Sequence, residues 1–527
     1  MTGDADALRE SPIEDDSIAG GCEHRRGRRL GGDRLWLGTG IGAGLLAVAV
    51  YLATNPYPAY GAGLYVQIAR EIVAHGYGLP ARIPGYTAAG VPFSYPPLQF
   101  YVLAVLLDLG GDPITVARLL PSVGFLAALV PTYLLARDYA NSRPAGAAAS
   151  VAVALNPQLV QWHLSAGGVV RAFALCYALA AIYAGFRIFE TRSRRAVVAG
   201  LVAFAATLLS HPTYALFVVV SYLLLWAVRD RSRRGFALGT VVGLGGLALA
   251  TPWLAWTAAT HGLDVFWAAA GTHGGVGGGL ATLLDGASFT LLPLVGAAYL
   301  LVVRRDWFLA CWAAATESVF AQPRFAFTVG SVVWGVVGVD VARRSSALDG
   351  TVPGGFDRRA ALAAVVLVAG SAAGGTYLVH ETTLASDPST PAFLDDDAVD
   401  AMAWAAEQTP PDATFVVLGD AAEWFPALTD RTILIGPWGV EWRGTAAYDR
   451  QLDAYESVSR CRSVDCVESV ASTVDGSSDY VYLPKRTYTV RGEAIAEFGT
   501  LERSFERSAA WERAYENDGV VVFRATE

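Results

Sequence analysis

Two arginines stand where apolar runs begin, which is an unusual place for a positive charge. Arg171 lies at the start of one run, and Arg324 follows a proline at the start of another. The planar guanidinium binds two oxygens of a phosphate at once, so either position could hold a phosphorylated ligand. The alternative for each is an arginine whose stem lies on apolar surface while its charged end reaches water.

The polar segment 54–112 is rich in tyrosine and proline and carries other side chains that could bind a ligand. Its densest stretch contains Tyr95 followed by Pro96 and Pro97, which fix φ and form a rigid start for the next helix. A segment ordered in this way favours a binding role, and the alternative is a simple cap over the protein. His211 lies next to a proline between two apolar runs, where it could bind substrate or serve as a hydrogen-bonded structural histidine.

The apolar runs that flank these residues predict a polytopic α-helical membrane protein. Hydrophobic residues make up 53% of the chain and charged residues 17%, against about 25% charged residues in soluble domains. We count about 11 transmembrane helices, several of them short for a span. The runs are Leu35–Ala53, Pro113–Ala136, Pro144–Asn156, Gly168–Phe189, Ala196–Ser210, Pro212–Val228, Phe236–Trp256, Ala287–Val303, Trp307–Thr316, Phe325–Ala342 and Ala360–Val379.

Arginine-rich turns predict the orientation of these helices, because basic loops stay in the cytoplasm. With the N-terminus inside, the basic segments from 25–34 through 343–359 all fall on the cytoplasmic face. Residues 1–34 then form a disordered cytoplasmic tail, and 54–112 is a long first external loop. This orientation requires Leu98–Leu109, only about a dozen residues long, to be an interfacial or re-entrant helix rather than a span.

Residues 395–527 have the pattern of a soluble α/β domain, which follows a linker at 381–394. The orientation of the helices places this domain outside the cell. The expected strands are 414–419, 432–436, 479–483 and 519–524, and the expected helices are 398–407 and 448–459.

This C-terminal domain is strongly acidic. After Leu394 there are 25 Asp and Glu against 12 Lys and Arg, and Lys485 is the one lysine of the sequence. Such a surface is typical of a halophilic archaeon, and the alternative is a high-GC genome that favours arginine codons. No basic patch is large enough for nucleic acid. Cys461 and Cys466 could form a disulfide in an external domain, and the alternative is two free thiols.

The order of these features resembles the GT-C glycosyltransferases, lipid-dependent membrane enzymes that include protein mannosyltransferases, aminoarabinose transferases and oligosaccharyltransferases. The resemblance covers about residues 35–380 and includes the long first external loop and the external tail that follows the spans. It rests on Gly63-Leu64-Tyr65 after the first span, on Pro96-Pro97-Leu98, and on Arg118-Leu119-Leu120-Pro121-Ser122 at the second span.

This resemblance implies transfer of a sugar from a polyprenyl-phosphate-linked donor to a protein, glycan or lipid acceptor on the external face. Arg324 would hold the carrier's phosphate, with Arg171 as the second candidate. Tyr65, Tyr95 and His211 would contact substrate. Membrane lipids are the remaining expected partners, no cofactor is identified, and a divalent metal ion is left open.

The sequence departs from the family at the expected catalytic carboxylate. GT-C enzymes carry Asp or Glu shortly after the first span, whereas residues 55–63 contain no acid. The base that accepts the acceptor's proton is then assigned to Glu71, for which a solvated helix face is the alternative. Other carboxylates that could serve are Glu317, Asp264 and Asp285.

Two other functions are left open by the sequence. A non-catalytic relative that binds a lipid carrier or scaffolds glycan assembly would also tolerate the missing acid. A secondary transporter is the second alternative, although neither an inverted repeat nor paired acids inside the spans is visible.

Overall fold

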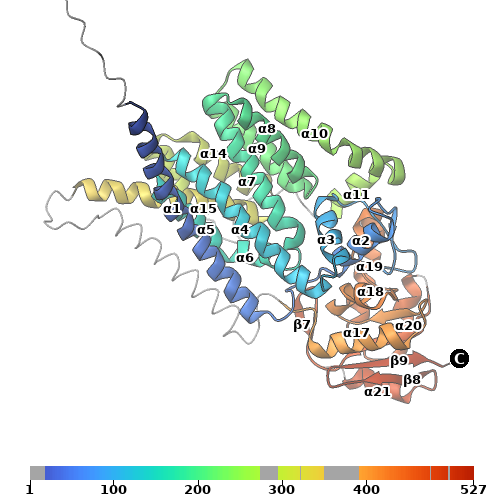
Figure 1. The fold of residues 1–527 in the computed structure, drawn as a ribbon. Helices are drawn as coiled ribbons and strands as arrows, with labels where there is room; N and C mark the ends of the chain where they lie inside the picture. The colour runs from blue at the N-terminus through green and yellow to red at the C-terminus, as the bar shows by residue number, and fades with distance from the viewer. Residues whose placement is uncertain are drawn as a thin grey trace, which may run out of the picture.

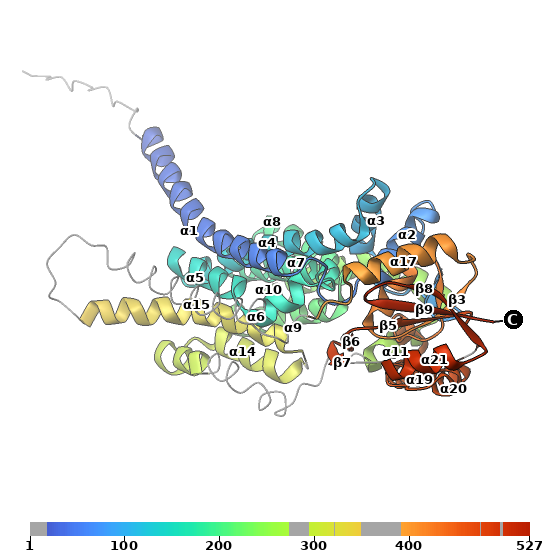
Figure 2. The same cartoon turned by 90° about the horizontal axis from the view of Figure 1, so that it is seen from below.

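The computed structural model describes residues 18–272, 295–320, 322–348, 391–474, 476–495 and 499–526. A bundle of long helices leads into a smaller α/β domain at one end, and Figures 1 and 2 show that domain at the end far from the N-terminus. The chain is therefore a polytopic helical membrane protein with a C-terminal α/β domain, as the sequence predicts.

The bundle helices follow the apolar runs of the sequence. Proline stands in the first turn of several of them. Proline lacks a backbone N–H, and at this position the N–H would have no hydrogen-bond partner within the helix. The helices are α1 (Ile18–Thr54), α4 (Pro113–Tyr139), α5 (Arg143–Ala154), α6 (Pro157–Leu164), α7 (Gly168–Thr191), α8 (Arg194–Leu208), α9 (Pro212–Arg229), α10 (Arg233–His261), α11 (Asp264–Thr272), the short η1 (Leu300–Arg304), α14 (Trp307–Val319) and α15 (Pro323–Leu348).

Six helices among the described residues are long and apolar enough to cross a membrane, and they belong to α1, α4, α7, α9, α10 and α15. Three other predicted spans form helices of only 12, 15 and 13 residues, namely α5, α8 and α14. A straight span needs about 20 residues. The run Ala360–Val379 and the first half of the run Ala287–Val303 lie outside the described residues, so the count of about 11 spans stays a prediction.

The segments on either side of the first span differ in how well they were predicted. The tail expected to be disordered through residue 34 is helical from Ile18, because α1 extends backward through arginines, which favour helix. Leu98–Leu109 forms α3 (Leu98–Asp108), which is too short to span, and α2 (Gly63–Ala74) precedes it. The short α3 agrees with the prediction that this run is a helix too short to span, and its place at the membrane surface stays a prediction.

The arginine-rich turns meet at one end of the bundle. Asp33 forms ion pairs with Arg137 at 3.2 Å and with Arg143 at 2.8 Å. Arg229 at the end of α9 pairs with Glu190 near the end of α7 at 3.1 Å. The opposite end of the bundle carries α2, α3 and the C-terminal domain (Figure 1).

The C-terminal domain is built on a five-stranded sheet with strand order β4–β3–β5–β9–β8. Strand β3 (Thr414–Val417) is parallel to β4 (Thr432–Ile433) and to β5 (Tyr480–Pro484), whereas β9 (Val520–Ala525) is antiparallel to β5 and to β8 (Trp511–Glu516). Each of the four predicted strand segments contains a strand. The other elements are α17 (Asp396–Gln408), η3 (Asp420–Glu423), α18 (Phe425–Thr429), η4 (Val440–Arg443), α19 (Thr445–Val458), α20 (Val464–Ala471), η5 (Ser472–Val474), α21 (Gly499–Arg507), and the hairpin β6 (Tyr488–Val490) and β7 (Glu493–Ile495).

The first loop and the C-terminal domain share one hydrophobic core. Ile68 of α2 and Phe100 of α3 are fully buried in the same cluster as Phe415, Trp424 and Tyr482 of the domain. Burial of each such side chain stabilises the folded protein by roughly 1.5–3 kcal/mol. The shared core therefore holds the first loop and the C-terminal domain together as one unit.

Backbone pairing strengthens this junction. The Ile433 N–H of β4 donates to the Gly85 carbonyl at 2.9 Å, which adds a residue of the first loop to the edge of the sheet. The Tyr60 N–H donates to the Pro391 carbonyl at 3.0 Å. Next to Gly85, the loop forms its own small hairpin, β1 (Arg82–Ile83) with β2 (Val91–Pro92).

Candidate functional site

A cleft of about 410 Å³ opens where the bundle, the first loop and the C-terminal domain meet. The domain contributes η3, which directly follows the carboxyl end of β3, the position where open α/β sheets commonly bind ligands. The charged residues that line the cleft are Arg171, Asp420, Glu423, Glu441 and Arg491.

Arg171 reaches the cleft from the first turn of α7. Its guanidinium carbon lies 5.2 Å from the centroid of the Trp162 ring. The guanidinium folds back over the start of the helix, where a Cβ on Gly167 would lie 1.5 Å from its terminal nitrogen. Within the described ranges Arg171 forms no ion pair, and its Nε has no hydrogen-bond partner.

Arg324 begins α15 close to this cleft and is only 7% exposed. It donates a hydrogen bond to Gln322, and its guanidinium carbon lies 5.4 Å from the centroid of the Tyr214 ring. No carboxylate pairs with it in the part of the chain that the structure describes, and its Nε is also without a partner.

The two arginines belong to one positive site. Arg171 and Arg324 are near enough for their charges to interact, and both charges act on Tyr65. Two cations held largely out of water without a counter-ion are unfavourable, because neither the lost hydration nor the mutual repulsion is offset. An anionic ligand would supply the missing partner.

A buried histidine fixes the ring that lies against Arg324. His163 is fully buried, with Nδ1 2.8 Å from the Leu159 carbonyl oxygen and Nε2 2.7 Å from the Tyr214 hydroxyl. Burial lowers the pKa of His163 to about 3, so the ring is neutral. Since the carbonyl can only accept, Nδ1 carries the proton and Nε2 accepts the hydrogen bond that Tyr214 donates.

Two of the cleft's carboxylates are already held by hydrogen bonds. Asp420 accepts from the Tyr455 hydroxyl at 2.5 Å and from the backbone N–H groups of Arg491 and Gly492 at 2.9 Å and 2.8 Å. Glu441 of η4 accepts from the Tyr95 hydroxyl. Asp420 therefore ties η3 to the β6–β7 hairpin, and Glu441 ties η4 to the first loop.

Glu423 differs from these two carboxylates. It is 8% exposed, and among the described residues its carboxylate has no hydrogen-bond or ion-pair partner. Burial, followed by the charges of Asp420 and Glu441, raises the pKa of Glu423 to about 8, and the positive charge of Arg171 opposes this rise. Glu423 is thus a carboxyl group that can exchange a proton near neutral pH.

Aromatic side chains cover the cleft between the charged groups. Tyr65 and Tyr95, both predicted to bind substrate, line it with their ring centroids 6.2 Å apart. Tyr60 stacks on Trp162 with centroids 5.8 Å apart. Burial raises the pKa of Tyr65 above its ordinary value, which keeps its hydroxyl neutral. Such a lining presents apolar faces together with hydroxyl groups.

The predicted catalytic carboxylate does not reach this cleft. Glu71 lies six residues beyond Tyr65 on α2, about 9 Å farther along the helix axis and on a different side. Its carboxylate is 3.7 Å from Nδ1 of His75, and it does not line the cleft. Burial raises the pKa of Glu71, with the charge of His75 opposing this rise.

The remaining predicted residues lie near the cleft or away from it. His211 precedes α9 and contacts Tyr214, with ring centroids 5.2 Å apart, so it adjoins the site of Arg324 without lining the cleft. Asp264 is exposed at the start of α11, and Glu317 is buried in α14, again outside the cleft. Asp285 lies outside the described residues.

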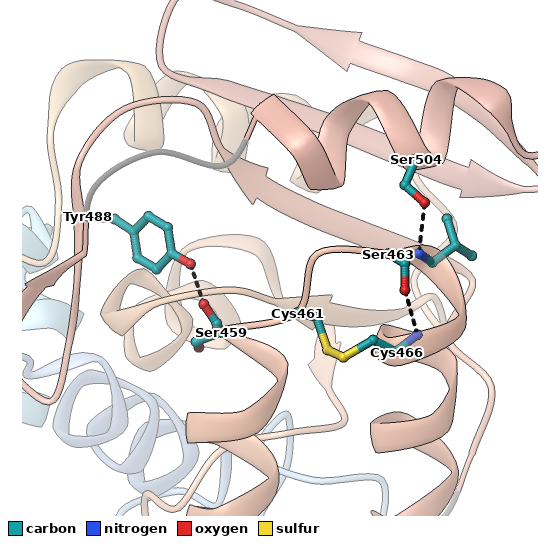
Figure 3. The surroundings of a disulfide bond; sticks show 7 residues. Ser459, Cys461, Ser463, Cys466, Tyr488 and Ser504 are labelled. Atoms are coloured by element: carbon teal, nitrogen blue, oxygen red, sulfur yellow. Dashed lines mark hydrogen bonds between the residues drawn. A yellow bond between two sulfur atoms is a disulfide. The ribbon is translucent and has the colours of Figure 1, made fainter.

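Cys461 and Cys466 form a disulfide that joins the end of α19 to α20 (Figure 3). Their Cα atoms are 5.6 Å apart. Ser463 between them caps α20 by accepting a hydrogen bond from the Cys466 N–H at 3.4 Å. The disulfide does not line the cleft, and its role is to hold two helices of the soluble domain together.

Sequence reasoning missed Glu423 and Glu441, because both lie far from the first loop along the chain. The available signal was indirect: residues 55–63 lack an acid, and Gly61 in that stretch leaves space beside the cleft. In the described ranges no group of three or more His, Cys, Asp or Glu is placed to hold a metal ion.

Comparisons with known proteins agree with this architecture. Residues 94–256 match the family of dolichyl-phosphate-mannose-protein mannosyltransferases. No curated protein matches by sequence.

Three solved structures share the fold at low sequence identity. Oligosaccharyltransferase AglB from Archaeoglobus fulgidus, in complex with an inhibitory peptide and a dolichol-phosphate, has a TM-score of 0.54 and 14% identity over 94% of this chain and 74% of that one. ArnT from Cupriavidus metallidurans, bound to undecaprenyl phosphate, has a TM-score of 0.54 and 14% identity over 93% and 98% of the two chains. Mycobacterial arabinofuranosyltransferase AftD has a TM-score of 0.57 and 14% identity over 94% of this chain but 40% of its own length.

Proposed function

Because this chain is a membrane protein with the GT-C glycosyltransferase fold, we propose that it transfers a sugar from a polyprenyl-phosphate-linked donor to an acceptor at the external face of the membrane. The observation that carries the proposal is the pair of arginines, Arg171 and Arg324, which have no counter-ion in the described part of the chain and adjoin a cleft that also contains carboxylates. A phosphate group would neutralise the arginines, and the carboxylates would serve the proton chemistry of the transfer.

The tyrosines of the cleft suit the sugar. Tyr65 and Tyr95 present a hydroxyl and an apolar ring on the same surface, and a sugar offers both hydroxyl groups and apolar C–H faces. His211 supports the arginine site through its contact with Tyr214, so its proposed role in substrate binding is indirect. The solved relatives that bind dolichol-phosphate or undecaprenyl phosphate make this carrier class the natural donor to test.

The external location is supported by the two ends of the bundle. The arginine-rich turns form ion pairs at the end opposite the cleft, and basic turns face the cytoplasm in membrane proteins. The cleft and the soluble domain would then share the outer compartment. A disulfide in that domain fits an oxidising environment.

The proposal can be tested in a deletion strain that is complemented with variants of this chain. We expect the wild type to restore the missing glycan of envelope proteins or lipids, whereas Arg171→Ala and Arg324→Ala do not. Arg231→Ala, which removes an exposed arginine at the opposite end of the bundle, should restore it fully. A glycan profile that is unchanged by the deletion would contradict the proposal.

Binding of dolichyl phosphate to the purified protein separates the alternatives. Each arginine variant should bind roughly 10- to 100-fold more weakly, because a hydrogen bond to a charged group contributes about 1.5–3 kcal/mol. Carrier binding without any glycan change would indicate the non-catalytic relative. If the protein neither binds the carrier nor changes the glycan, the secondary transporter becomes the favoured function.

A further inference from the structure

The first loop lacks an acid at the place where its fold family carries one, and a carboxylate from the other domain fills that space. Residues 55–63 contain neither Asp nor Glu. A Cβ built on Gly61 would lie 1.5 Å from Oε2 and 2.6 Å from Oε1 of Glu423. The carboxylate of Glu423 therefore occupies the volume that a side chain at position 61 would occupy.

We infer that Glu423 is the catalytic base of the transfer reaction, supplied by the soluble domain in place of an acid in the first loop. The inference rests on the proposed function, because a base is needed here only if an acceptor hydroxyl loses its proton as it is glycosylated. It replaces Glu71, which lies away from the cleft.

The step that Glu423 would perform is a single proton transfer coupled to substitution at the sugar. The acceptor hydroxyl gives its proton to the Glu423 carboxylate while its oxygen forms a bond to the anomeric carbon of the donor. The bond from that carbon to the phosphate oxygen breaks, and its electron pair leaves with the polyprenyl phosphate, which Arg171 and Arg324 hold. Glu423 then releases the proton to water.

The hydrogen bonds of the cleft single out Glu423 among its carboxylates. Asp420 accepts three hydrogen bonds that fix the local backbone, and Glu441 accepts one from Tyr95. These bonds leave those oxygens less available to an acceptor. Among the described residues, only the Glu423 carboxylate of these three has no hydrogen-bond partner, although it lines the cleft.

The position of Glu423 is set from both sides of the domain junction. Its carbonyl accepts a hydrogen bond of 2.5 Å from the Tyr86 hydroxyl of the first loop. A Cβ on Gly63 would lie 2.0 Å from the same carbonyl oxygen, so α2 begins in direct contact with this backbone. The next residue, Trp424, is fully buried in the shared core. The carboxylate is thus held in place by the loop whose own acid is missing.

The charges around Glu423 supply a pH signature. Burial and the neighbouring carboxylates raise its pKa to about 8, against the effect of Arg171. Only the ionised form can accept a proton, so the transfer rate should fall about tenfold for each pH unit below this pKa and level off above it. The titratable and charged groups that act on Glu423 or are acted on by it are Asp420, Glu441, Arg171, Tyr65, Tyr86 and Tyr455.

The test uses the full chain in detergent or liposomes, with transfer and dolichyl phosphate binding measured on the same samples. We expect Glu423→Gln to lower the transfer rate roughly 10²- to 10⁴-fold and to leave carrier binding unchanged. Glu407→Gln makes the same chemical change on an exposed face of the same domain and should behave as wild type. Glu71→Gln should keep nearly all activity.

A relocated acid provides a second, independent measurement. Gly61 does not have a positive φ, so its backbone accepts a side chain once the Glu423 carboxylate is removed. The double variant Gly61→Asp with Glu423→Ala should recover part of the activity that Glu423→Ala alone loses. Its pH profile should shift slightly downward, because aspartate has a lower ordinary pKa than glutamate.

The outcomes distinguish this inference from the proposed function. If the wild type transfers sugar and Glu423→Gln does so at the same rate, Glu423 is not the base, although the function stands. Loss of activity in Glu71→Gln alone would return the role to Glu71. If Glu423→Gln unfolds, the double variant Gly61→Asp with Glu423→Ala tests the inference instead. A double variant that folds and binds carrier but is inactive would overturn the inference. A wild type that never transfers sugar would remove both.

Discussion

At the residue scale, a glycine beside Arg171 determines where its charge lies. The guanidinium occupies the space next to Gly167 at the start of α7, and a Cβ there would lie 1.5 Å from a terminal nitrogen and 2.5 Å from the central carbon. Gly167 has helical backbone angles, so alanine is compatible with its conformation. A methyl group at this position would therefore move the cation rather than distort the helix.

Gly167→Ala should weaken carrier binding with little change in stability. We expect the affinity for dolichyl phosphate to fall about tenfold, because a displaced Arg171 guanidinium would form a weaker hydrogen bond to the phosphate. The thermal midpoint in detergent should stay near the wild-type value. Gly338→Ala is the matched control, since a Cβ there would have no atom of the described structure within 4 Å. Equal carrier affinity in both variants would show that Arg171 does not bind the phosphate.

The sequence singled out four residues that the structure brings to one region. Arg171 and Arg324 were predicted from their positions at the starts of apolar runs, and Tyr65 and Tyr95 from the family resemblance; the role of each stays a prediction. Glu423 could not be found in that way, because acidic residues are common throughout its domain and its importance comes from packing against residues more than 350 positions earlier.

At the scale of elements, the edge strand β4 extends its pairing into the first loop. Ile433 bonds to the carbonyl of Gly85, whose φ is +86°, a conformation that residues with a Cβ rarely adopt. A Cβ at Gly85 would also lie 2.7 Å from Pro426 of α18. Two short elements of the domain thus depend on this one glycine of the loop.

Gly85→Ala should loosen the junction more than Gly76→Ala does. Both glycines have positive φ, so both variants carry the same conformational cost, of the order of 1 kcal/mol. Only Gly85 adds crowding against Pro426, which should destabilise by a further 1–3 kcal/mol or so. Thermal unfolding measures the loss of stability in both variants. The transfer rate of Gly85→Ala should also fall, because Pro426 closely follows η3, which carries Glu423. Equal losses in the two variants would show that the junction does not depend on this contact.

Element types were easier to predict than element lengths and partners. The short strands of the soluble domain were found from their β-branched and aromatic residues, and α3 from its apolar run bounded by Pro97 and glycines. The number of spans could not be fixed, because hydropathy identifies an apolar helix such as α5 or α8 but not whether neighbours or lipid cover it. The helical start of α1 was missed because charge suggested disorder where arginine also favours helix.

At the scale of the whole molecule, charge separates the two ends of the bundle. The end with Arg137, Arg143 and Arg229 is stabilised by ion pairs between helices, whereas the cleft end carries the acidic domain and its disulfide. The six-residue loop closed by that disulfide contributes about 2 kcal/mol to the domain by restricting the unfolded chain. Such a bond persists in an oxidising compartment, such as the outside of the cell. The proposed transfer from a polyprenyl carrier takes place in the same compartment.

These features predict that the two ends label from opposite sides of the membrane. Ser477→Cys places a thiol on the exposed surface of the soluble domain, and Arg195→Cys places one at the start of α8, beside the arginine-rich turns. In intact cells a membrane-impermeant maleimide should label Ser477→Cys and leave Arg195→Cys unlabelled until the membrane is opened. The three native cysteines outside the disulfide, Cys22, Cys176 and Cys311, are replaced by alanine in both variants.

The same measurement decides whether the site can work as a unit. Arg171 sits on the bundle and Glu423 on the soluble domain, so both must face the compartment in which donor and acceptor meet. Labelling of Arg195→Cys from outside would place the cleft in the cytoplasm, where a disulfide between Cys461 and Cys466 would be reduced. A donor displayed on the outer leaflet could not then reach the arginines, because the sugar-phosphate headgroup does not cross the bilayer unaided.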